Sequence, residues 1–142
     1  MLNQMSQTAI KAVIYLASQK DGNDNAGIRE IAGYIDASEH TVGKVLQTLA
    51  RAGIINSVKG PSGGFHISRE QLKRPIIHIV DAIEGKELFT QCGLGLKKCS
   101  ASRPCPIHYE YKAARELTYK IFASKKIADL CNPVNNGLAY LI

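Results

Sequence analysis

The chain has 142 residues, 45% of them hydrophobic, and this length favours one domain or a domain with an appendage over a multidomain enzyme. No run approaches the ~18 uninterrupted apolar residues of a membrane helix, and residues 1–4 lack a basic-then-apolar signal pattern. We therefore expect a cytoplasmic protein with no membrane partner, whose four cysteines suit metal binding or redox chemistry better than disulfides.

The net charge of +6 is unevenly distributed along the chain. Residues 27–74 carry seven Lys or Arg against four Asp or Glu, a net +3, and residues 86–126 carry nine against three, a net +6. The first excess is compatible with a polyanionic partner. The second is compatible with cations that stabilise cysteine thiolates, or with an ordinary solvated basic surface.

The first predicted elements are three helices. Ser6 is expected to cap a helix with apolar residues at helical spacing, which ends at the loop of residues 21–25. A second helix is predicted over residues 28–35, and Ser38 is expected to cap a third that ends near Gly53. Two short helices joined by a tight turn predict a helix-turn-helix.

A β-hairpin is predicted directly after these helices. Residues 54–58 and 65–67 have the pattern of strands, and residues 59–64 between them are rich in Gly, Pro and Ser. The glycines leave room for close approach to a phosphate backbone or a minor groove, and Lys59 supplies charge. Such a hairpin alone is more often an ordinary loop, but after a helix-turn-helix it predicts a wing.

The rest of the chain is predicted to be helical apart from one long loop. Pro75 suits the first turn of a helix that ends at Gly85. A long helix is predicted from about Ile107, with an apolar stripe that either pairs with its copy in a second subunit or packs on its own domain. Ser124 is expected to cap a last helix, and residues 137–142 are apolar enough to pack.

The predicted fold is therefore mostly α with a small β-hairpin wing. We expect a winged helix-turn-helix DNA-binding domain over residues 1–85 and a cluster-binding loop over residues 86–106. Residues 107–142 then form a dimerisation helix and C-terminal tail.

The loop contains a group of soft and borderline metal ligands. Cys92, Cys99, Cys105 and His108 are spaced Cys-x6-Cys-x5-Cys-x2-His, which predicts a metal or iron-sulfur site. Three cysteines and a histidine also form a zinc set, but zinc ligands usually come in Cys-x2-4-Cys pairs, which are missing here. A cluster-free thiol redox switch is a further alternative, and His108 instead caps or packs at the helix start if it is no ligand. Cys131 is expected to be a buried small apolar residue.

The predicted DNA contacts lie on the third helix, the wing and the second helix. His40 and Thr41 suit base edges, and Lys44 and Lys59 suit phosphates, whereas Ser38 caps its helix with a hydroxyl free for phosphate. Arg29 either reaches the backbone or forms a surface ion pair. The complete predicted set is Arg29, Ser38, His40, Thr41, Lys44, Lys59, Gly60, Pro61, Ser62 and Gly63.

Other classes of function explain fewer segments. An electron-transfer protein needs a cluster but no wing, and a DNA-independent interaction module needs no positively charged DNA-binding surface. The four histidines are scattered, without a carboxylate spacing that indicates catalysis, so we expect no enzyme.

The chain resembles the Rrf2 superfamily of bacterial winged-helix repressors, which includes IscR-like, NsrR-like and RirA-like regulators. The likeness covers nearly the whole chain. It is carried by residues 6–12, the helix-turn-helix, residues 58–65 of the wing and the three cysteines before the long helix.

The resemblance implies a homodimer crossed through the long helix, bound to a palindromic operator in double-stranded DNA, with the third helix in the major groove and the wing toward the minor groove. It also implies a cluster sensing iron-sulfur status, redox conditions or nitric oxide. IscR-like proteins complete a 2Fe-2S site with a histidine at the place of His108, whereas NsrR-like proteins use an acidic residue where Gln7 stands here. We therefore favour 2Fe-2S, with 4Fe-4S, zinc or a cofactor-free form as alternatives. Two departures are the six-residue first cysteine gap, one longer than usual in IscR, and Gly43 where IscR has an acidic residue.

Overall fold

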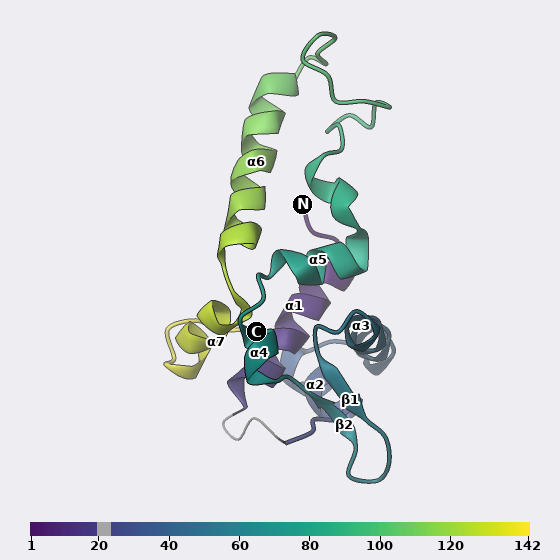
Figure 1. Cartoon of the computed structure of the whole chain (residues 1–142), viewed down its shortest axis with the longest axis vertical. Coiled ribbons are helices and arrows are strands. Elements are labelled where there is room, and N and C mark those ends of the chain that lie inside the picture. The colour runs from purple at the N-terminus through teal and green to yellow at the C-terminus, as the bar shows by residue number, and fades with distance from the viewer. Residues whose placement is uncertain (20–23) are drawn as a thin grey trace.

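The computed structural model describes residues 1–19 and 24–142, so that residues 21–23 of the predicted loop lie outside the described part. The molecule is elongated, with the β-hairpin at one end and the loop between η1 and α6 at the other (Figure 1). The elements are α1 (Gln4–Ser18), α2 (Ile28–Ile35), α3 (Glu39–Arg51), β1 (Asn56–Val58), β2 (Gly64–His66), α4 (Arg69–Leu72), α5 (Ile77–Glu84), the 3-10 helix η1 (Lys86–Phe89), α6 (His108–Ser124) and α7 (Ile127–Asn135).

Helix α1 forms the centre of the core. It packs against α2, α3, α5 and α7, and the side chains of Ala9, Ala12 and Val13 are fully buried at these contacts. The prediction that Ser6 caps this helix was wrong. The cap is Asn3, whose side-chain oxygen accepts a hydrogen bond from the Ser6 amide at 2.8 Å, and Ser6 itself is buried. The helix begins earlier because Asn3 satisfies one of its free N–H groups.

Helices α2 and α3 form the predicted helix-turn-helix. Asp36 ends α2 in the left-handed conformation (φ 53°), and Ser38 caps α3 as predicted. Four apolar residues of α3 are fully buried, which explains why its spacing gave a clear helical signal: Val42, Val45, Leu46 and Leu49. Gly53 follows with φ +72°, a conformation that glycine adopts without strain.

The hairpin is the predicted wing, with shorter strands. β1 and β2 pair antiparallel in the register Asn56↔His66 to Val58↔Gly64. Ile54 and Ile55 were expected in the first strand but lie outside it, because both are buried in the core before the hairpin begins. An unpredicted bridge extends the sheet: Ala26 and Phe65 exchange two backbone hydrogen bonds of 2.9 Å, which join the wing to the segment before α2.

The later helices differ from the prediction at their ends. The expected strand-to-helix connection contains α4, which has a capping box between Ser68 and Gln71, and the expected loop contains η1. Ser124 does not cap the last helix, because it is the final residue of α6, and α7 begins after Lys126. Gly85 ends α5 as predicted, with φ 82°.

Residues 137–142 pack on the rest of the chain only in part. Leu138, Tyr140 and Ile142 are each at least 80% exposed, whereas Ala139 and Leu141 are half-buried. Helix α7 packs on α1, with Ile127 and Cys131 buried. Cys131 is buried, as predicted. None of the helices within the described ranges is long and apolar enough to cross a membrane.

Candidate DNA-binding surface and cysteine site

The first two turns of α3 and its cap contain four of the residues that were predicted to contact DNA. Ser38 accepts a hydrogen bond from the Thr41 amide at 3.1 Å, and its hydroxyl donates to the Thr41 hydroxyl at 2.8 Å. These two hydroxyls therefore already take part in hydrogen bonds at the N-terminus of α3. His40 and Lys44 are exposed and form no hydrogen bond or ion pair through their side chains with the described residues.

Arg29 projects from α2 beside this turn. Its guanidinium Nε lies 3.7 Å from a carboxylate oxygen of Glu39, and both side chains are largely exposed. An exposed pair of this kind contributes at most about 1 kcal/mol. Arg29 is therefore held near the start of α3 but remains accessible.

The tip of the wing combines exposed residues with a tight turn. Lys59, Gly60, Pro61 and Ser62 are exposed, whereas Gly63 is half-buried and donates its amide to the Gly60 carbonyl at 2.9 Å. A Cβ at position 63 would lie 2.1 Å from the Val58 carbonyl oxygen. Glycine at this position is thus required by the turn itself.

A groove of about 810 Å³ lies between α3 and the wing. Among its lining residues are Gln47 and Ser57, which the sequence interpretation did not include, together with Arg51 and Lys59. The helical spacing held a signal for Gln47, because it lies one turn after Lys44 on the exposed face of α3. Ser57 was missed because its position depends on the hairpin register.

A hydrogen-bond network joins the wing to the segment before α2 and to α4. His66 Nδ1 lies 2.9 Å from Asn25 Oδ1, and its Nε2 lies 3.3 Å from Asn56 Nδ2. Asn56 and Gln71 are linked by amide contacts of 3.0 and 3.2 Å, and Asn25 donates to the Ser62 carbonyl at 3.1 Å. The network joins four separate parts of the chain, and sequence spacing alone did not indicate it.

The cysteine site lies at the opposite end of the molecule, between η1 and the start of α6 (Figure 1). The Cys99 sulfur lies 3.4 Å from His108 Nδ1. Cys92 and His108 are buried, whereas Cys99 and Cys105 are half-buried. Of the four predicted ligands, Cys99 and His108 are therefore in direct contact.

Local backbone groups favour the thiolate form of Cys92. The amides of Leu94 and Leu96 donate hydrogen bonds to its sulfur and lower its pKa, with smaller contributions from Cys105 and from the positive charge of Arg115. Burial raises the pKa of the Cys131 thiol in contrast. A sulfur that is easily deprotonated suits metal ligation, and an apolar buried thiol does not.

Three thiols and one imidazole are chemically suitable ligands of an iron-sulfur cluster. His108 is 5% exposed, and its Nε2 is buried without a hydrogen-bond partner among the described residues. A buried polar atom normally has a partner, so this nitrogen is chemically available to a ligand. Within the described ranges, no three or more His, Cys, Asp or Glu side chains are arranged to hold a metal ion. The residues fit a cluster by chemical type, and Cys99 and His108 are the two that lie in direct contact.

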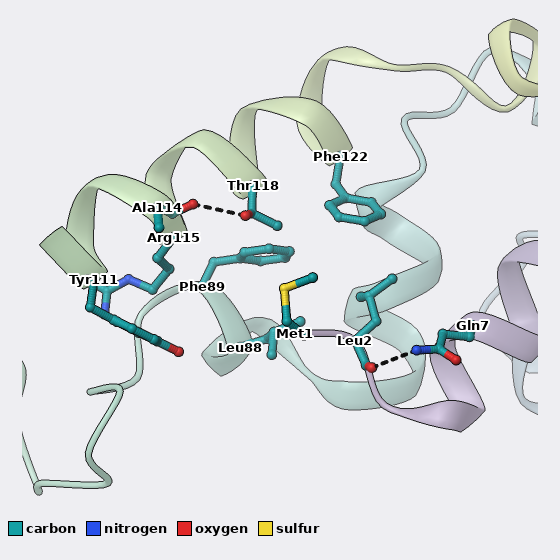
Figure 2. Close-up of a pocket in the computed structure, with 10 residues that line it drawn as sticks. All are labelled: Met1, Leu2, Gln7, Leu88, Phe89, Tyr111, Ala114, Arg115, Thr118 and Phe122. Atoms are coloured by element: carbon teal, nitrogen blue, oxygen red, sulfur yellow. Dashed lines mark hydrogen bonds between the residues drawn. The ribbon is translucent and has the colours of Figure 1, made fainter.

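Arg115 is a residue of this site that the sequence interpretation missed. It lies on α6, two turns after His108, and its guanidinium donates to the Gln91 carbonyl and lies 3.6 and 3.7 Å from the Cys99 sulfur. Figure 2 shows Arg115 beside Tyr111 at the edge of an apolar pocket of about 230 Å³ formed by residues from η1, α6 and the start of the chain. Its identity as a basic residue was visible in the sequence, but its partners were not.

These features together define a winged-helix DNA-binding protein with a cysteine-rich loop attached to a long helix. A family model described as Rrf2, iron-dependent transcriptional regulator, matches residues 2–133. The chain belongs to this family and is a transcriptional regulator. The resemblance inferred from the wing and the cysteine loop is thereby confirmed.

Similar proteins and structures agree with this assignment. A protein described as a putative HTH-type transcriptional regulator of Aquifex aeolicus is 31% identical over 126 residues, which cover 87% of this chain and 86% of that one. The structure of CymR, the global cysteine regulator of B. subtilis, has a TM-score of 0.74 at 19% identity and covers 93% of this chain and 96% of its own. The IscR structure from T. potens also has a TM-score of 0.74 at 19% identity, with coverage of 98% and 91%. These two structures confirm the predicted winged-helix fold.

Proposed function

We propose that this protein is a homodimeric repressor that senses iron-sulfur status, redox conditions or nitric oxide through a labile 2Fe-2S cluster. The ligands are Cys92, Cys99, Cys105 and His108. The observation that carries the proposal is the contact of 3.4 Å between the Cys99 sulfur and the buried imidazole of His108, whose second nitrogen has no partner among the described residues. The description of the family as iron-dependent supports a metal-based signal.

A cluster bound here supplies one-electron redox chemistry and sensitivity to oxidants, nitric oxide and iron loss. The chain's own residues prepare for it. The Leu94 and Leu96 amides favour the Cys92 thiolate. Imidazole ligation by His108 raises the potential relative to a fourth thiolate and adds a group that can protonate. The loop begins beside η1 and leads directly into α6, so its conformation is passed to that helix.

The proposed DNA contacts are the exposed residues at the start of α3 and the tip of the wing. We assign base edges to His40 and Thr41 and phosphates to Lys44, Lys59 and Arg29. Ser38 and Gly63 have structural roles in the helix cap and the turn, with the backbone of the wing tip facing the DNA. A homodimer presents two such surfaces to a palindromic operator. The protein then works in the cytoplasm, where DNA is found.

Dimerisation through α6 is supported by the apolar residues that this helix exposes. Leu117 is 63% and Ile121 51% exposed, and α6 contacts little of its own chain beyond η1 and α5. An exposed apolar stripe on a long helix commonly marks an interface. We accordingly assign residues 1–85 to DNA binding, residues 86–106 to the cluster and residues 107–142 to the dimer.

The proposal is tested by purification without oxygen, followed by the visible spectrum and by analysis of iron, sulfide and zinc. We expect a coloured protein with two iron and two sulfide ions per chain, as a 2Fe-2S cluster requires. Cys99→Ala is expected to abolish the colour while the protein remains folded. Cys131→Ala, the same substitution at a buried thiol outside the site, is the matched control and should leave the spectrum unchanged.

Other results decide against the proposal. A colourless protein with stoichiometric zinc supports a structural zinc site, and a colourless metal-free protein that reacts with peroxide at these cysteines supports a thiol switch. Four iron and four sulfide ions per chain replace 2Fe-2S by 4Fe-4S.

A further inference from the structure

We propose that Arg115 is the positioning residue of the cysteine site, which fastens both ends of the segment 91–99 to helix α6. Its guanidinium donates one hydrogen bond to the carbonyl of Gln91, directly before Cys92. The same group lies 3.6 and 3.7 Å from the sulfur of Cys99, at the other end of the segment. One side chain thus contacts the chain directly before Cys92 and again at Cys99.

The contacts need an arginine rather than any cation. A guanidinium carries five N–H donors in a planar fork, so it can serve the Gln91 carbonyl and the Cys99 sulfur at once, whereas an ammonium is a single point of charge. The fork is itself held in place. Its carbon lies 6.0 Å from the centre of the Tyr111 ring, one turn earlier on α6.

Tyr111 connects this arrangement to the cysteine loop from a second side. A Cβ added at Gly93 would lie 2.7 Å from the Tyr111 ring, so the loop backbone after Cys92 rests directly on that ring. The segment 91–99 is therefore packed against one face of α6, by hydrogen bonds through Arg115 and by contact through Tyr111. Any change at Cys99 reaches α6 through a direct contact.

The consequence for redox chemistry rests on the proposed function. Hydrogen bonds and positive charge at a ligand sulfur stabilise the reduced state of an iron-sulfur site, because that state carries more negative charge. The contact of Arg115 with Cys99 therefore raises the reduction potential. Arg115 acts through Cys99 and is no ligand.

The first test uses the full chain without metal and measures hydrogen-deuterium exchange by mass spectrometry. In Arg115→Gln, amides of residues 91–100 should exchange about tenfold faster than in the wild type, as loss of a charge-assisted hydrogen bond predicts. Lys112→Gln removes the same charge one turn earlier and is the control; among the described residues, the Lys112 side chain is paired with exposed Glu116 alone. Unchanged exchange in Arg115→Gln, or equal acceleration in both variants, overturns the proposal.

The second test compares reduction potentials of the loaded proteins. Arg115→Gln should have a more negative reduction potential than the wild type and than Lys112→Gln. The potential of Arg115→Lys should lie between those of Arg115→Gln and the wild type, because lysine keeps the positive charge but loses the planar set of N–H donors. Arg115→Lys also replaces Arg115→Gln in both tests if the latter does not fold. An unchanged potential reduces Arg115 to a structural contact and overturns its role at the site. If the wild type loads no cluster, the proposed function fails, and the exchange result alone decides whether Arg115 positions the loop.

Discussion

The polar residues near the start of α3 divide into those that the protein uses internally and those that it leaves to solvent. Ser38 and Thr41 hydrogen bond to each other, and Arg29 is paired with Glu39. His40, Lys44 and Lys59 are exposed, and their side chains have no such partner among the described residues. An unpaired cation on the wing is free to bind a phosphate without first giving up an internal contact, which makes Lys59 the most direct residue to test.

We expect Lys59→Ala to weaken binding to all DNA sequences alike. Loss of one phosphate contact should lower the slope of log K against log salt by about one unit per subunit, because fewer counterions are released. Binding titrations at several salt concentrations measure this slope. Lys112→Ala, on α6 and outside the proposed DNA contacts, is the control. An unchanged slope for Lys59→Ala removes this side chain from the interface.

At the scale of elements, the wing is a small sheet that depends on its surroundings. A hairpin with two strands of three residues has little stability by itself. Here it is fastened by the Ala26–Phe65 backbone pair and by the network of Asn25, His66, Asn56 and Gln71. These contacts hold the wing against the segment before α2 and against α4.

Gly63→Ala is expected to displace the wing tip, because the added Cβ would lie 2.1 Å from the Val58 carbonyl. The overpacked turn should cost about 1–3 kcal/mol in the free energy of unfolding and lower DNA affinity at the same time. Thermal unfolding and DNA titration measure the two effects. The neighbouring exposed Ser62→Ala should leave the free energy of unfolding unchanged, and normal binding by Gly63→Ala contradicts the strained turn.

At the scale of the whole molecule, the DNA-binding surface and the cysteine site lie at opposite ends of the long axis (Figure 1). In the proposed function, a signal at the cysteines therefore reaches α3 through packed elements. The route available within one chain runs from the loop to α6 and η1, then to α5, which packs on α1 and α3. In the proposed dimer through α6, a shift of that helix has a second effect, because it changes the spacing between the DNA-binding surfaces of the two subunits.

Leu117→Asp should separate the two subunits. A carboxylate buried in an apolar interface is costly, and loss of about 3 kcal/mol raises the dimer dissociation constant by more than a hundredfold. Sedimentation velocity over a range of protein concentrations measures the change. Lys112→Asp, on the opposite face of α6, is the control, and a monomeric wild type or a fully dimeric Leu117→Asp contradicts an interface on this face.

The sequence was most informative where local chemistry decides local structure. The apolar spacing of α3, its cap Ser38 and the glycines of the wing all predicted what the structure contains, because each depends on near neighbours along the chain. The errors have one cause in common. Ser6 and Ile54 have local features of a cap and a strand, but both are buried in the core, and α1 and the hairpin begin elsewhere.

The sequence by itself determined the class of fold and the family. Helical spacing, turn residues and the set of three cysteines with one histidine are properties of short segments. They can be recognised without knowledge of the tertiary packing. Only the tertiary structure paired Cys99 with His108, placed Arg115 against a loop 16 residues earlier in the chain and separated the site from the wing. These are contacts between segments whose approach depends on how the whole core packs, and no local pattern encodes that.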